Sequence, residues 1–144
     1  MPMVMNGKPI ILSGDKLAVA GRVVHLKGID APEENQQCHV KSGRAFDCGL
    51  VAKTALMDLT AAANVACQLT GKRRNGVPEA QCFAASYDLS KGMVHTGWAL
   101  AWPRKGTIYG AVERAAQKAR RGLWCGKFDK PWDWRKARHG QTND

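Results

Sequence analysis

The feature that most constrains this chain is a pair of carboxylate-bearing turns on either side of one apolar run. The first turn is Ser13-Gly14-Asp15-Lys16, the run is Val23-Val24-His25-Leu26, and the second turn is Gly28-Ile29-Asp30-Ala31-Pro32-Glu33. A strand folded back on its neighbour would bring the two turns together. Carboxylates that gather in a basic protein favour a hard cation with oxygen ligands. The carboxylates concerned are Asp15, Asp30 and Glu33.

Apolar periodicity predicts a mixed α+β fold. Gly21-Arg22 is a hairpin signal because glycine accepts a positive φ in a tight turn. The order of elements predicts a five-stranded Greek-key barrel of the OB type with three helices. We expect one domain with a core at about 7–135 and a basic, polar tail at 136–144. The expected strands are 9–12, 17–20, 23–26, 65–69 and 80–84, and the expected helices are 44–63, 88–98 and 109–121.

Composition indicates a folded, basic domain. The 144 residues are 44% hydrophobic and carry a formal net charge of +10, which favours a polyanionic partner: nucleic acid, acidic polysaccharide or an anionic membrane face. The alternative is that the charge only maintains solubility. No apolar run approaches the roughly 20 residues of a membrane span, and no signal peptide is visible. An exported form would have lost its signal before this sequence begins.

Several short motifs follow one another over about residues 7–135. They are Gly14-Asp15, the 26–33 segment (Leu-x-Gly-Ile-Asp-Ala-Pro-Glu), Gln37-Cys38, Cys48-Gly49, Asp88-Leu89, the 94–99 segment (Val-x-x-Gly-Trp-Ala), Ala119-Arg120-Arg121-Gly122-Leu123-Trp124 and Pro131-Trp132-Asp133-Trp134-Arg135. In this order they resemble the staphylococcal nuclease (thermonuclease) family. The resemblance implies an OB-type barrel and a phosphodiesterase acting on nucleic acid.

The same resemblance implies a calcium site. In the family, two aspartates hold Ca²⁺, a glutamate orients or deprotonates water, and two arginines bind the phosphate. The aspartates match Asp15 and Asp30, with the Ala31 carbonyl as a further oxygen ligand, and the glutamate matches Glu33. The carboxylate cluster has an alternative, in which Lys16 neutralises it and no metal binds.

The chain departs from the family at both arginines. His25 and Val77 stand at the two positions, and His25 is only a weak substitute. Loss of one charge-stabilising donor typically lowers a rate by about 10²–10³. Lys16, Arg73 and Arg74 are the candidate replacement phosphate ligands. We expect the tryptophans to pack in the core and tail and not to serve as base-stacking platforms.

The five cysteines allow two bridges. We expect Cys38–Cys48 and Cys67–Cys82, which are sterically sensible and which look similar in exported bacterial members of the family; the alternative is reduced, packed cysteines. Bridges imply an oxidising compartment, periplasmic or extracellular. Cys125 is then a free thiol or the site of an intermolecular bridge, so we expect a monomer or a disulfide-linked dimer.

Three classes of function are therefore open. The first is a weak or altered Ca²⁺-dependent phosphodiesterase, favoured by the three carboxylates. The second is an inactive module that binds a polyanion or a protein partner, favoured by the missing arginines. The third is a structural partner in an envelope assembly, linked through Cys125.

Overall fold

The computed structural model describes residues 4–142, with side chains through residue 138. Its main sheet has seven strands in the order β1-β8-β9-β4-β3-β2, with β10 paired to β9. The β4–β9 pair is parallel and the other pairs are antiparallel. The strands are β1 (Val4–Gly7), β2 (Ile10–Ser13), β3 (Lys16–Val19), β4 (Arg22–Leu26), β8 (Val65–Arg74), β9 (Val77–Ala84) and β10 (Tyr87–Asp88).

Because the first and last strands of this order are consecutive in sequence, one chain segment connects the two ends of the sheet. This is the arrangement of an OB-type barrel. Two small two-stranded sheets accompany it. They are β5 (Ile29–Asp30) with β11 (Leu100–Ala101), and β6 (Cys38–His39) with β7 (Ala45–Phe46).

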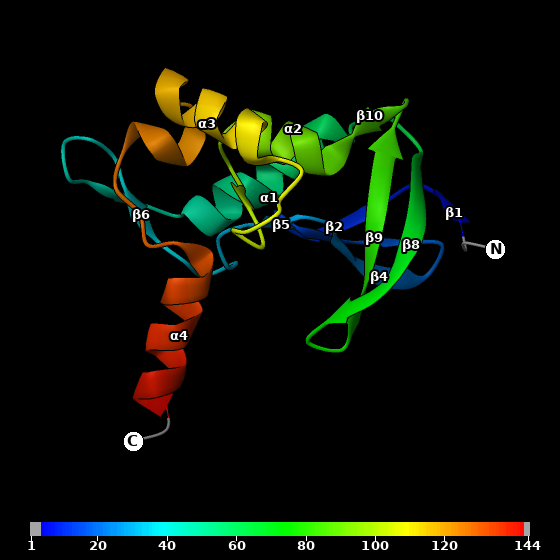
Figure 1. The fold of residues 1–144 in the computed structure, drawn as a ribbon, viewed down its shortest axis with the longest axis horizontal. Helices are drawn as coiled ribbons and strands as arrows, with labels where there is room; N and C mark the ends of the chain where they lie inside the picture. Colours follow the sequence, from blue (N-terminus) through cyan, green and yellow to red (C-terminus); the bar gives the residue numbers. More distant parts are fainter. Residues whose placement is uncertain (1–3, 143–144) are drawn as a thin grey trace.

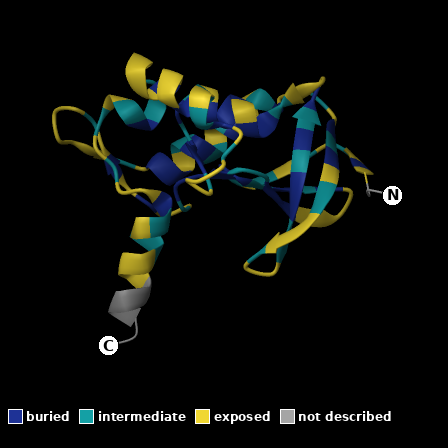
Figure 2. Cartoon of the chain, in the orientation of Figure 1, coloured by how far each residue is buried: buried dark blue, intermediate teal, exposed yellow. Residues whose placement is uncertain are grey.

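Helices α1, α2 and α3 gather on one side of the molecule, and α4 projects away from them (Figure 1). Burial is deepest where the sheet meets α1 and α2 (Figure 2). A second, smaller cluster contains the Cys38–Cys48 pair and Leu123, with Trp132 packed against it. The helices are α1 (Cys48–Leu59), α2 (Leu89–His95), α3 (Gly110–Ala119), the 3₁₀ helix η1 (Gly122–Cys125) and α4 (Pro131–Thr142). No helix in residues 4–142 has the length and apolar character of a membrane span.

The α+β barrel is confirmed, with differences in its elements. In the described residues the main sheet has seven strands where the sequence predicts five, and there are four α-helices where the sequence predicts three. The first helix begins at Cys48 and not near Arg44, because Ala45 and Phe46 pair with β6 instead. Residues 136–142, expected as a polar tail, continue α4. Asp88 caps α2 as expected, with its carboxylate accepting from the backbone N–H of Ser90 and Lys91.

Both expected disulfides are present. Cys38–Cys48 joins β6 to the first residue of α1, and Cys67–Cys82 joins register partners on β8 and β9. Cys125 is free and exposed.

We expect one reactive thiol in the denatured, non-reduced protein and five after reduction, by titration with Ellman's reagent. Each bridge closes a short loop and should stabilise the fold by about 2–4 kcal/mol, so reductant should clearly lower the melting temperature. Five thiols without reductant, or an unchanged melting temperature, would contradict the pairing.

Candidate functional site

Asp15 lies in the tight turn between β2 and β3, where it is buried beside His25 of β4. Its Oδ2 accepts the Ala31 N–H at 2.8 Å and lies 3.3 Å from His25 Nε2, while Oδ1 accepts the Ser13 hydroxyl at 2.9 Å. Burial opposes ionisation of Asp15, but these hydrogen bonds and the imidazole outweigh it and lower its pKa to about 2. Asp15 is thus held as a carboxylate by the protein itself.

Asp30 and Glu33 are paired with Arg135 of α4, which lies 105 and 102 residues after them in the sequence. Arg135 Nη1 donates to Asp30 Oδ1 at 3.0 Å and to Glu33 Oε1 at 2.7 Å, and Nη2 donates to Asp30 Oδ2 at 2.6 Å. The Asp30 side chain is 1% exposed. Burial raises the pKa of Asp30, and the hydrogen bonds from Arg135 oppose that shift. The hydrogen bonds to Asp30 raise the pKa of Arg135.

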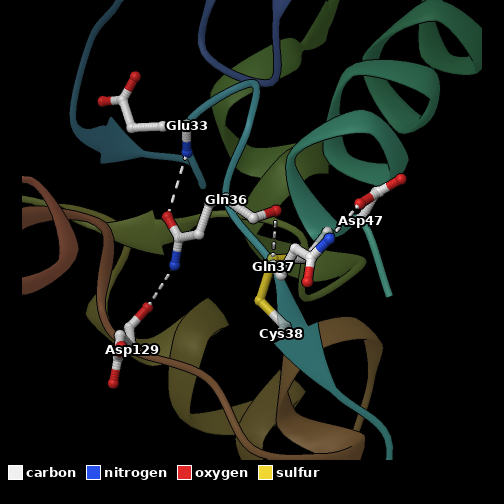
Figure 3. The surroundings of a disulfide bond; sticks show 7 residues. Glu33, Gln36, Gln37, Cys38, Asp47 and Asp129 are labelled. Atoms are coloured by element: carbon white, nitrogen blue, oxygen red, sulfur yellow. Dashed lines mark hydrogen bonds between the residues drawn. A yellow bond between two sulfur atoms is a disulfide. The ribbon is translucent and has the colours of Figure 1, made fainter. Parts of the chain in front are cut away.

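Gln36 fixes the Glu33 turn and the approach to α4 at the same time (Figure 3). This fully buried amide accepts from the Glu33 N–H at 3.2 Å through Oε1 and donates to the Asp129 carbonyl at 2.8 Å through Nε2. The neighbouring His39 exchanges two backbone hydrogen bonds of 2.8 Å with Lys127. The segment that precedes α4 is therefore attached to the segment that carries Glu33.

Arg74 reaches the site from the end of β8, directly opposite Val77 in the ladder. Side chains opposite each other in an antiparallel pair lie on the same face. Arg74 Nη1 donates to the Ile29 carbonyl at 2.7 Å and lies 3.0 Å from His25 Nδ1. Its guanidinium stacks on Trp102, 4.2 Å from the ring centroid. Arg74 therefore lies next to both His25 and Val77, the two positions at which the family resemblance leads us to expect arginines.

A cleft opens between the β8–β9 turn and the first turns of α4, the two elements that face each other in Figure 1. Its volume is about 490 Å³. Four of its lining residues are cationic and two are tryptophans, and Trp102 belongs to neither hydrophobic cluster. The lining residues are Arg73, Arg74, Asn75, Trp102, Trp132, Arg135 and Lys136.

The structure brings together most of the residues singled out from the sequence. Asp15, His25, Asp30, Ala31 and Glu33 form one cluster, with Arg74 beside it. Arg73 lines the cleft but donates to Gly76 in its own turn. Lys16 lies opposite His25 on β3 and makes none of the ion pairs of these carboxylates in the described residues. Arg135 pairs with Asp30 and Glu33, and His25 lies against Asp15.

These residues do not fit a calcium ion in this arrangement. Both oxygens of Asp15 and both of Asp30 accept hydrogen bonds, and Glu33 is shared with Arg135. Among the described residues, no group of three or more His, Cys, Asp or Glu side chains is placed to hold a metal ion. The positive charge of Arg135 would also repel a divalent cation bound to the same carboxylates.

Sequence reasoning missed the roles of Arg135, Gln36 and Trp102. Arg135 stands in a motif that carried the resemblance, but nothing in its spacing links it to Asp30. Gln36 lies next to the Gln37-Cys38 motif and gives no signal of its burial. Trp102 and Arg74 are brought together only by the barrel.

Comparison with known proteins agrees with the fold. A family model described as "Staphylococcal nuclease homologue" matches residues 23–126, a range that includes neither Asp15 nor Arg135. "Succinoglycan biosynthesis protein ExoI" of Rhizobium meliloti (strain 1021) is 30% identical over 122 residues, which cover 82% of this chain and 63% of that protein.

Two relatives from Oryza sativa subsp. japonica, "Probable staphylococcal-like nuclease CAN2" and "CAN3", are each 26% identical over 140 residues, or 95% of this chain. The chain spans 35% and 34% of their lengths. The family match covers well over half of the sequence and runs from β4 through η1, a range that includes α1, α2 and α3. This chain belongs to the staphylococcal nuclease family.

Proposed function

We propose that this chain binds a single nucleic-acid strand in the cleft between the β8–β9 turn and α4, without requiring a metal ion. The observation that carries the proposal is the position of Arg74, stacked on Trp102 at the edge of the carboxylate cluster. Within the described residues, both of its hydrogen bonds use Nη1, so Nη2 and Nε can donate to a phosphate.

The chemistry of the cleft favours a strand with phosphates and bases. Arg73 and Lys136 add positive charge next to Arg74. Trp102 lies outside both hydrophobic clusters and lines the cleft with Arg74 stacked on it, so the pair can present planar surfaces to a base. The net charge of +10 adds long-range attraction to a polyanion. The rice relatives are named as nucleases, which supports nucleic acid over other polyanions.

Slow phosphodiester hydrolysis is the second candidate. It is supported by the position of Arg74 opposite Val77 and beside His25, where its guanidinium can partly replace the two arginines that this chain lacks. Against it stands the engagement of Glu33 by Arg135, because Oε1 of this carboxylate is occupied by the guanidinium and is not free to orient a water molecule. Binding is therefore the function that this geometry supports best.

We infer that the protein works in an oxidising compartment, periplasmic or extracellular. The support is the pair of disulfides, since such bridges are rare in reducing compartments.

The binding proposal predicts that a fluorescein-labelled oligothymidylate binds in the presence of EDTA, with an affinity that falls steeply as salt rises. Arg74→Gln should weaken binding about tenfold and reduce the salt slope by about one, because one phosphate contact is lost. Fluorescence anisotropy measures both quantities.

Lys118→Gln, which removes an exposed charge on α3, is the matched control and should leave the affinity unchanged. Cleavage of the same strand, followed on a gel with Ca²⁺ and with EDTA, tests the second candidate. Equal effects of Arg74→Gln and Lys118→Gln would show that the charge acts nonspecifically and not through the cleft. Equal competition by an acidic polysaccharide would refute nucleic acid as the preferred ligand.

A further inference from the structure

The guanidinium of Arg135 contacts the carboxylates as a bound cation would, because it bridges Asp30 and Glu33 at the same time. Arg135 spans both oxygens of Asp30 and also reaches Glu33, while the Asp30 side chain is almost completely buried. A buried carboxylate needs a compensating charge, and removing that charge from such a pair is strongly unfavourable.

The first turn of α4 is attached where it leaves the body of the protein. Pro131 is buried, Trp132 packs on the second cluster, and Gln36 holds the Asp129 carbonyl. The residues after Arg135 are exposed as far as the side chains are described, through Arg138. Arg135 is therefore the last described residue of α4 that contacts the carboxylates.

We propose that Arg135 is an internal counter-ion that replaces the divalent cation of this fold, so that helix α4 keeps the carboxylate cluster free of metal. Both oxygens of Asp30 and Oε1 of Glu33 accept N–H groups from Arg135, and the guanidinium adds a positive charge that opposes Ca²⁺. Binding of a divalent ion then requires displacement of Arg135 from Asp30. This inference concerns the cation and does not depend on the binding of nucleic acid.

The test compares Ca²⁺ binding in five proteins by isothermal titration calorimetry and by thermal unfolding. They are the wild type, Arg135→Gln, Arg138→Gln, Asp30→Asn and the double variant Arg135→Gln/Asp30→Asn. Arg138 stacks on Trp134 of the same helix, so Arg138→Gln removes an equal charge away from the cluster.

We expect no saturable binding of millimolar Ca²⁺ by the wild type or Arg138→Gln. Arg135→Gln should bind Ca²⁺ and gain about 5 °C in melting temperature at saturation, because the ion stabilises only the folded state. The double variant should lose this gain. If Arg135→Gln does not fold, Arg135→Lys retains the charge but cannot bridge both carboxylates, and it should bind Ca²⁺ more tightly than the wild type.

The proposal would be overturned if the wild type binds Ca²⁺ and Asp30→Asn abolishes that binding, because Arg135 would then not exclude the ion. Absence of binding in Arg135→Gln, or in Arg135→Lys should the first variant not fold, would also overturn it. Since strand binding is measured in EDTA, neither result bears on the proposed function, and the two proposals can fail separately.

Discussion

Replacing Gly97 with alanine is expected to destabilise the fold by at least about 3 kcal/mol, as in other substitutions that force backbone atoms apart. Gly97 has a φ of +82°, and a Cβ there would overlap the carbonyl group of Arg121. The backbone of α2's C-terminal turn crosses that of η1 at this point, where the Leu123 N–H donates to the Gly97 carbonyl at 2.9 Å. No side-chain rotation relieves an overlap between a Cβ and the main chain.

Gly76→Ala is the matched control for the conformational part of this effect. Gly76 has a φ of +80° in the β8–β9 turn, but a Cβ added there would meet nothing within 4 Å. The substitution should cost only about 1–2 kcal/mol, the penalty of the left-handed conformation. Urea unfolding of both variants measures the difference, and equal losses would show that the crossing can relax.

Asp15→Asn is expected to remove about 2–3 kcal/mol of stability at pH 7, with a loss that shrinks as the pH falls toward 2. The folded pKa of about 2 lies below the ordinary aspartate value of 3.8. A carboxyl with a depressed folded pKa stabilises the protein above its unfolded pKa and loses that contribution as the pH falls through the folded pKa. The difference between wild type and variant should therefore be full above pH 4 and decline between about pH 4 and 2.

Chemical denaturation at a series of pH values checks this expectation. Asp58→Asn, which changes an exposed carboxylate on α1, is the control and should differ little from the wild type at any pH. A difference between wild type and Asp15→Asn that stays constant from pH 7 to pH 2 would indicate that shape and not charge sets the role of Asp15.

Local sequence patterns predict the parts of the fold that local chemistry decides. The hairpin around Gly21, with a φ of +76°, joins β3 and β4 and brings the Asp15 turn to the Asp30 segment, as the apolar run and its flanking turns indicate. The Asp88 cap follows from a similar short-range signal, whereas the two disulfides are expected from steric plausibility together with the family resemblance. The motifs that contain Gly97 and Gly122 are visible in the sequence, but their meeting in space is a tertiary property that no spacing shows.

The candidate site is predictable in its acidic residues and not in its cations. Asp15, Asp30 and Glu33 lie on adjacent turns, so a single hairpin is enough to gather them. Arg74 comes from the end of β8, where it is the ladder partner of Val77, and Arg135 comes from α4. The positions of both arginines depend on the finished barrel. Lys16 is the plausible neutralising residue in the sequence because it is next to Asp15, yet the ion pairs go to more distant side chains.

The long sequence distance between Asp30 and Arg135 has a consequence for biosynthesis. A chain that emerges from the ribosome N-terminus first has all seven strands of the main sheet by residue 88, well before residue 135 is made. Over that interval the residues of all seven strands have been made, but Arg135, whose guanidinium pairs with Asp30 in the finished structure, has not. The contact that compensates Asp30 can therefore form only after the rest of the barrel has been synthesised.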